Sequence, residues 1–301
     1  MTRKAFLIAA ALLTPLAAQA KVKVVATIGD LGAIAREVGG DAVQVETLAR
    51  PTQDPHLVDA KPSLVLVLAR ADLLLLNGMD LEVGWLPALL VGSRNSNVQL
   101  GAVGYLDCST LVSPKEVPMA KLDRSMGDVH PGGNPHYTKD PANAVLLARA
   151  IAGRLAEIDP PHAEIYRKGA ATFTQSLSAR MSQWRQALAP YKGTPVVTYH
   201  KSWIYFTDWA GVDEVAFIEP KPGIPPNPAH VANVLRVIKD RKVPVLLQED
   251  WYSAQTSELL TRASGARLVR VPGMTGDAQS YIAYTDRLVN ALVSGLSGKA
   301  G

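Results

Sequence analysis

The stretch "PHAEIYRKGAATFTQSLSARMSQWRQALA" (residues 161–189) carries apolar residues at spacings of three and four positions. These residues are Tyr166, Ala170, Phe173, Leu177, Met181, Trp184 and Leu188. Such spacing puts all of them on one face of an α-helix. At the usual rise of 1.5 Å per residue the helix is roughly 43 Å long, which exceeds the length of one small lobe. The sequence therefore predicts one long rigid helix that joins two lobes.

Short apolar runs typical of β-strands alternate with helical patterns on both sides of this stretch. The runs before it cover residues 21–28, 42–49, 72–78 and 97–103, and those after it cover 194–200, 212–218, 242–250 and 266–271. Near-continuous apolar strands separated by helices are typical of parallel sheets covered on both faces. The predicted fold is therefore α/β, with two Rossmann-like lobes of mostly parallel sheet joined by the long helix.

The first twenty residues, "MTRKAFLIAAALLTPLAAQA", have the pattern of a secretory signal peptide. Arg3 and Lys4 precede an apolar run that is too short for a membrane anchor, and Ala18-Gln19-Ala20 matches a small-residue cleavage site. We expect residues 1–20 to be removed after Ala20, and the mature protein to be periplasmic.

The domain boundaries of the mature chain follow from helix signals in its middle. Asp140 followed by Pro141 is a capping pair, and it predicts a helix that runs to about Ile158. We expect an N-terminal lobe over residues 21–140 and a C-terminal lobe over 193–301. The helical segment between them, 141–192, includes the bridging helix.

The net charge argues against nucleic-acid binding, and the cysteine content excludes a cysteine-based metal site. The formal net charge is +4, and the signal peptide holds two positive and no negative side chains, so the mature value is near +2 (4 − 2). This weak, scattered positive charge argues against nucleic-acid binding. The single cysteine, Cys108, excludes an internal disulfide and a cysteine-based zinc site. A metal site in this chain would depend on His, Asp and Glu.

Three of the six histidines occupy similar places in the predicted fold. His56 follows a strand, His136 lies in a loop just before a helix, and His200 ends a strand. Ligands in open α/β sheets collect at the carboxyl ends of strands, and imidazole suits zinc, copper, iron and nickel. Each histidine alone is better explained as a surface or hydrogen-bonded loop residue, whereas three together suggest one metal site. Two of the other three, His162 and His230, lie at helix starts and are expected to be structural or neutral.

The order of the motifs resembles the zinc and manganese substrate-binding proteins of ABC transporters, the ZnuA/TroA-like group (cluster A-I type). The matching motifs are Asp54-Pro55-His56, Pro62-Ser63, "ADLLLLNG" (71–78), "NPHYTKDP" (134–141) and "YHKSWIYF" (199–206). Together they extend over nearly the whole mature chain. The resemblance implies two α/β lobes bridged by a rigid helix, with the metal held between them.

The resemblance also implies the ligands and the cargo. By motif, the metal ligands are His56, His136 and His200. Manganese binders of the group tend to have Glu where this chain has His200, and three nitrogens favour Zn²⁺ over Mn²⁺. The implied protein is a periplasmic monomer that captures Zn²⁺ as transported ligand. It would deliver the ion to an inner-membrane ABC permease, with a periplasmic zinc chaperone as an optional further partner.

The fourth ligand is left open by the sequence. Asp277, in "VPGMTGDAQSY" (271–281), is the favoured candidate, although its local context differs from the family pattern. Glu249 and Asp250, which end the strand at 242–250, are competitors, and water is the remaining alternative. His130, in the loop 125–135, is either an exposed loop residue or a transient ligand that passes zinc to His136. The Pro-rich loop 219–228 is expected to flank the same cleft.

Two alternative functions compete with this interpretation. A secreted zinc hydrolase would use three His, a bound water and Glu249 as base. The chain contains neither HExxH nor G-x-S-x-G, so we expect no enzyme. A manganese-binding or other divalent-metal-binding member of the same family is the nearer alternative.

Overall fold

The computed structural model describes residues 20–119, 127, 129–276 and 279–298. Residues 1–19 of the predicted signal peptide, Asp277 and part of the loop 125–135 therefore lie outside the described residues. Within the described residues, no helix is both long and apolar enough to cross a membrane.

The first lobe is built on a four-stranded parallel sheet in the order β2-β1-β3-β4. Its strands are β1 (Val22–Ala26), β2 (Val43–Thr47), β3 (Leu73–Leu76) and β4 (Tyr105–Asp107). The helices α1 (Gly29–Gly39), α2 (Pro62–Leu68) and α3 (Leu86–Ser93) alternate with them. β3 reads Leu-Leu-Leu-Leu, and all four residues are buried, as expected for a central strand covered on both faces.

The strand predicted at 97–103 is wrong. Residues Ser96–Val98 form a 3₁₀ turn capped by the side chain of Asn95, and the strand β4 begins only at Tyr105. Leu100 is 85% exposed, so the apolar residues of this segment do not all enter the core. Gly101, with φ +89°, lies in a turn where the strand would have continued.

The second lobe repeats the same strand order, β6-β5-β7-β8, and again every pair in its sheet is parallel. Its strands are β5 (Pro195–Thr198), β6 (Asp213–Phe217), β7 (Val245–Glu249) and β8 (Arg267–Val271). Its helices are α6 (Ile204–Ala210), α7 (Pro228–Asp240) and α8 (Gln255–Ser264). The prediction of two similarly built α/β lobes is confirmed.

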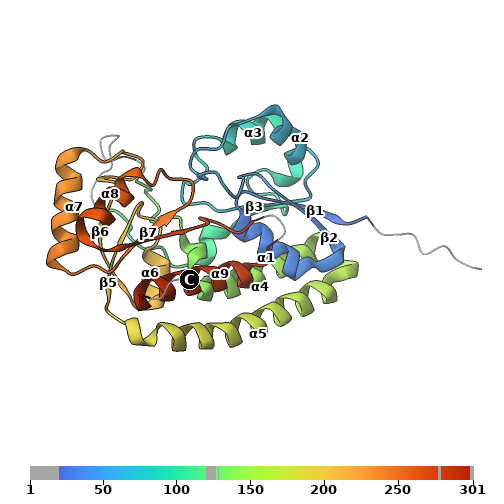
Figure 1. Cartoon of the computed structure of the whole chain (residues 1–301). Coiled ribbons are helices and arrows are strands. Elements are labelled where there is room, and N and C mark those ends of the chain that lie inside the picture. Colours follow the sequence, from blue (N-terminus) through green and yellow to red (C-terminus); the bar gives the residue numbers. More distant parts are fainter. Residues whose placement is uncertain (1–19, 120–126, 128, 277–278, 299–301) are drawn as a thin grey trace, which may run out of the picture.

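The long helix α5 (Ala163–Leu188) runs beneath both lobes (Figure 1). Its 26 residues make it about 39 Å long. All residues of the predicted apolar stripe are buried: Tyr166, Ala170, Phe173, Leu177, Met181, Trp184 and Leu188. They face α1, α4 (Pro141–Ile158) and α9 (Tyr281–Ser297), which lie between α5 and the two sheets. The bridging helix predicted from the sequence is confirmed.

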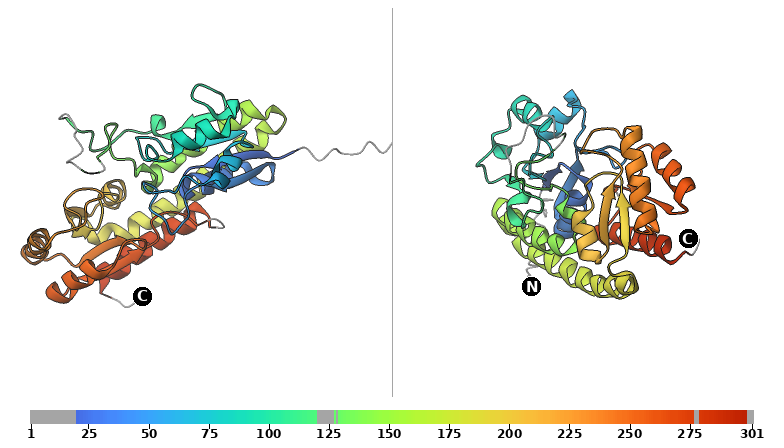
Figure 2. Two further views of the ribbon diagram at one scale, coloured as in Figure 1. Left: turned by 90° about the horizontal axis from the view of Figure 1, so that it is seen from above. Right: turned by 90° about the vertical axis from the view of Figure 1, so that its left-hand side faces the viewer.

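Polar contacts also join the two lobes above α5, where they lie side by side (Figure 2). Asp30 of α1 accepts hydrogen bonds from the backbone N–H and hydroxyl of Thr275 in the second lobe, at 2.8 and 2.7 Å. Lys139 Nζ donates to the carbonyl of Gly273 at 2.6 Å. These groups are buried, so the contact fixes how the carboxyl ends of the two sheets face each other.

Candidate metal centre

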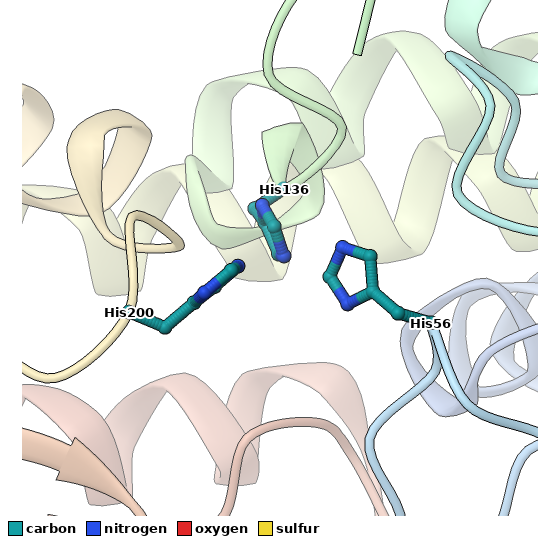
Figure 3. Close-up of side chains that lie close together, drawn as sticks. All are labelled: His56, His136 and His200. Carbon is teal, nitrogen blue, oxygen red and sulfur yellow. The ribbon is translucent and has the colours of Figure 1, made fainter. Parts of the chain in front are cut away.

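Three imidazoles from distant parts of the chain meet between the lobes. His56, His136 and His200 point toward one another from three separate segments (Figure 3). Their ring centroids form a nearly equilateral triangle, with separations of 5.2, 5.3 and 5.3 Å. One nitrogen of each ring lies within 4.8 Å of the others. Of the residues that the structure describes, no other group of three or more His, Cys, Asp or Glu side chains has this geometry.

Two of these histidines are held by the same local device. In Asp54-Pro55-His56 the Asp54 Oδ1 atom accepts from the His56 backbone N–H at 3.0 Å, and it lies 2.7 Å from His56 Nδ1. In Asn134-Pro135-His136 the corresponding distances are 3.1 and 2.9 Å. The proline between them fixes the backbone of a short Asx turn. The sequence of each tripeptide therefore sets the direction of its imidazole.

His200 is held by a residue far away in the sequence. It follows β5, and Glu219 follows the neighbouring strand β6. The Glu219 backbone N–H donates to the Tyr199 carbonyl at 3.0 Å, which continues the pairing of these strands and brings Glu219 beside His200. Glu219 Oε2 then lies 2.7 Å from His200 Nδ1.

These contacts orient the imidazoles for binding a metal. The Asp54 and Glu219 carboxylates only accept hydrogen bonds when ionised, so Nδ1 of His56 and of His200 must donate. Asn134 uses its amide nitrogen to donate to Glu116 and to the Lys201 carbonyl, which leaves its oxygen for His136 Nδ1. In all three rings the proton is on Nδ1, and the Nε2 lone pair is available to a metal.

The electrostatic surroundings differ between the three imidazoles. Burial holds the pKa of His136 well below its ordinary value, and the charges of neighbouring histidines and Lys139 act in the same direction. Burial alone would lower the pKa of His200, but the hydrogen bond and charge of Glu219 outweigh it and raise that pKa. Burial alone would raise the pKa of Asp54. The hydrogen bonds and charge of His56 outweigh burial and lower that pKa to about 2. His136 is therefore the ring that most readily stays neutral.

His130 is not the exposed loop residue that one alternative predicted. It is partly buried, and its Nε2 lies 3.3 Å from Nε2 of His56. Burial, with the charges of His56 and His200, lowers the pKa of His130 to about 3. The ring thus contacts His56, but it does not belong to the group of three converging imidazoles.

The candidates for a fourth ligand are placed differently. Asp277 lies outside the described residues. Glu249 is completely buried at the end of β7, where one carboxylate oxygen accepts from the Ser202 hydroxyl. Its side chain lines a small cavity of about 20 Å³ behind His136, together with Asn77 and Lys139, and it does not join the histidine triangle. Asp250 is exposed.

A cleft of about 320 Å³ opens onto the triangle. His130, His136 and His200 line it, and so do Pro220, Lys221 and Pro222. The expectation that the loop 219–228 flanks the site is confirmed. His162 and His230 lie elsewhere: His162 contacts Asp159, and His230 contacts the carbonyl of Phe217.

Three residues that support the site were missed from the sequence: Asn134, Glu219 and Tyr252. The repeated Asx-Pro-His pattern offers a signal for Asn134, because Asp54 and Asn134 each stand two positions before a histidine of the triangle. No comparable local signal marks Glu219, 19 positions from His200, or Tyr252, whose hydroxyl donates to Asp54 Oδ2 at 3.0 Å across 198 positions.

Comparison with known proteins places the chain in a family. The family model described as ZnuA, the periplasmic component A of the zinc-uptake complex, matches residues 24–295. The iron-binding protein YfeA of Yersinia pestis is 26% identical, over 91% of this chain and 86% of its own length. The manganese ABC transporter substrate-binding lipoprotein PsaA of Streptococcus pneumoniae is 28% identical, over 76% and 72%.

A crystal structure of ZnuA has the same fold. It superposes with a TM-score of 0.77 at 22% identity, covering 93% of this chain and 99% of its own. Members of the family are the metal-binding components of ABC transporters, not enzymes. The chain therefore belongs to the ZnuA family of metal-binding substrate-binding proteins, as its motifs predicted.

Proposed function

We propose that this protein binds Zn²⁺ between its lobes, through His56, His136 and His200, and delivers it to a membrane permease. The observation that carries the proposal is the triangle of imidazoles, each with Nδ1 bonded to an oxygen. Three neutral nitrogens in a partly buried site suit Zn²⁺, which forms tetrahedral complexes with Zn–N distances of about 2.0–2.1 Å. The bound ion is the transported cargo, and its binding involves no catalysed reaction.

The choice of zinc rests on the donor set, because the relatives are named for iron and manganese as well as zinc. Mn²⁺ prefers oxygen ligands, so a site dominated by imidazole should favour Zn²⁺. We expect calorimetric titration at neutral pH to give tighter binding of Zn²⁺ than of Mn²⁺ by at least about 100-fold, or roughly 2.7 kcal/mol. Tighter binding of Mn²⁺ would overturn the assignment of zinc.

The fourth ligand is proposed to be Asp277, and the same titration tests it with two variants. Asp277→Ala should weaken Zn²⁺ binding directly. Glu249→Ala should affect Zn²⁺ binding only indirectly, by changing the packing of the small cavity next to His136. Equal affinity in wild type and Asp277→Ala would remove Asp277 from the site. Because Glu249 is buried, its variant also needs a thermal unfolding measurement before its affinity is compared.

His130 is proposed to contact Zn²⁺ first, from its place in the cleft beside His56. Its position beside His56 changes the predicted route, since the ion would pass from His130 to His56 and not directly to His136. The low pKa of His130 keeps it neutral, as a zinc ligand must be.

The family implies an ABC permease as partner. We propose that the protein works as a periplasmic monomer after cleavage of residues 1–20 at Ala20. A periplasmic chaperone that supplies Zn²⁺ is an additional proposal. A pull-down from periplasmic extract, with this protein as bait, would test it by recovering a zinc-loaded partner.

We expect Zn²⁺ affinity to fall as the pH decreases, mainly because a proton competes at His200. The pKa of His200 is raised, and that of His136 is lowered, so falling pH protonates His200 first. Binding is therefore fully available above the pKa of His200 and declines by about tenfold per pH unit below it, for one competing proton. Competition with a chromophoric chelator from about pH 8 to about pH 5.5 measures the slope.

A variant of Glu219 tests whether the proton that competes with Zn²⁺ binds to His200. Glu219→Gln keeps a hydrogen-bonding side chain but removes the negative charge that raises the pKa of His200. The decline in affinity should then begin at a lower pH than in wild type. An unchanged pH profile in Glu219→Gln would show that the competing proton is not on His200.

A further inference from the structure

Tyr252 links the two halves of the metal site. It lies in the segment after β7, in the second lobe, and its hydroxyl donates to Asp54 Oδ2 of the first lobe at 3.0 Å. The other oxygen of the same carboxylate, Oδ1, accepts from the backbone N–H of His56 and bonds its Nδ1. One carboxylate therefore joins a ligand of the first lobe to a side chain of the second.

Apart from this bond, the contacts described for Tyr252 lie within the second lobe. Its ring stacks on Tyr199, with centroids 4.5 Å apart and planes 18° from parallel, and it lies 6.1 Å from the ring of His200. Its carbonyl accepts from Gln248 Nε2 at 2.9 Å, and from Arg270 at 3.3 Å. A displacement of the second lobe would therefore carry the hydroxyl with it.

The hydroxyl is the donor in this contact. Burial, followed by the nearby charges of Glu249, Asp54 and Glu219, raises the pKa of Tyr252, so the phenol keeps its proton. Asp54, an ionised carboxylate, can only accept. A hydrogen bond to a charged acceptor in a partly buried place is stronger than an ordinary one.

We infer that Tyr252 is a positioning residue of the metal site, which holds Asp54 and through it the His56 imidazole only while the two lobes keep this arrangement. The inference rests on the proposed function, because it concerns the same ligand. Separation of the lobes removes the donor from Asp54 Oδ2 and leaves the carboxylate held only by its own contacts with His56. A permease that parts the lobes would thereby weaken one ligand at the moment of release.

Tyr252→Phe tests the hydroxyl without removing the ring stack. Loss of an outer partner of a metal ligand typically costs 10–100-fold in affinity. We expect Zn²⁺ to bind about tenfold more weakly, with nearly all of the change in a faster dissociation rate measured by stopped-flow transfer to a chelator. Tyr199→Phe, which alters the other ring of the stack but leaves the bond to Asp54, is the matched control and should change affinity less than about twofold.

A double-mutant cycle separates this role from general support of the fold. If Tyr252 acts through Asp54, then Tyr252→Phe should have no further effect on dissociation in an Asp54→Ala background. An unchanged dissociation rate in Tyr252→Phe, or full additivity with Asp54→Ala, would overturn the inference. Failure of the wild-type protein to bind Zn²⁺ or Mn²⁺ would instead remove the proposed function, and this inference with it.

Discussion

Replacing His136 with alanine is expected to lower the affinity for Zn²⁺ by well over 100-fold. Loss of an outer partner of a metal ligand costs about 10–100-fold, and loss of the ligand itself must cost more. The position of His136 is restrained by its neighbours. Asn134 bonds its Nδ1, and the following residue, Tyr137, is completely buried. The Tyr137 hydroxyl donates to the Asn77 carbonyl at 2.6 Å. Its low pKa also makes it the ligand least subject to competition by protons.

Competition titration with a chromophoric chelator near neutral pH measures this loss, and circular dichroism with thermal unfolding verifies that the variant is folded. His162→Ala is the matched control. It also removes one imidazole, but one that contacts Asp159 at the start of α5 and not the triangle. Zn²⁺ affinity should be unchanged in that variant. A folded His136→Ala protein with wild-type affinity would place the metal site elsewhere.

Most of the fold was predictable because its signals are local. The βα alternation and the apolar stripe from Tyr166 to Leu188 depend on short-range spacing, and every residue of the stripe is buried as expected. The segment 97–103 was wrongly predicted because alternating apolar residues indicate a strand only when one face is covered. Leu100 and Val103 remain exposed there, so the pattern carried no information about burial.

The site was predictable to the extent that its residues lie in recognisable motifs. The two Asx-Pro-His tripeptides and the His at the end of β5 predicted three converging imidazoles, which the structure brings together. Their role as metal ligands stays a prediction. Contacts that depend on how strands and lobes meet were not predictable, because a carboxylate such as Glu219 in a Pro-rich loop has no local feature that distinguishes it. The contact between His130 and His56 is of the same kind, since it joins two loops 74 positions apart.

Gly169→Ala is expected to destabilise the protein, because the bridging helix lies against α1 at this position without room for a side chain. A Cβ atom at Gly169 would lie 2.1 Å from the carbonyl oxygen of Val38 and 2.8 Å from its carbonyl carbon. Both are backbone atoms near the end of α1, so one helix must move. Overpacking of this kind typically costs about 1–3 kcal/mol in the free energy of unfolding.

Gly153→Ala provides the matched control, because it makes the same change inside the neighbouring helix α4. Nothing lies within 4 Å of a Cβ atom there, so the substitution should stabilise the helix by up to about 1 kcal/mol. Chemical denaturation, with metal chelated, should therefore move the midpoints of the two variants in opposite directions. If both became more stable, then α5 would be free to move relative to α1. A helix held so loosely could not keep the two lobes, and hence the three imidazoles, at a fixed separation.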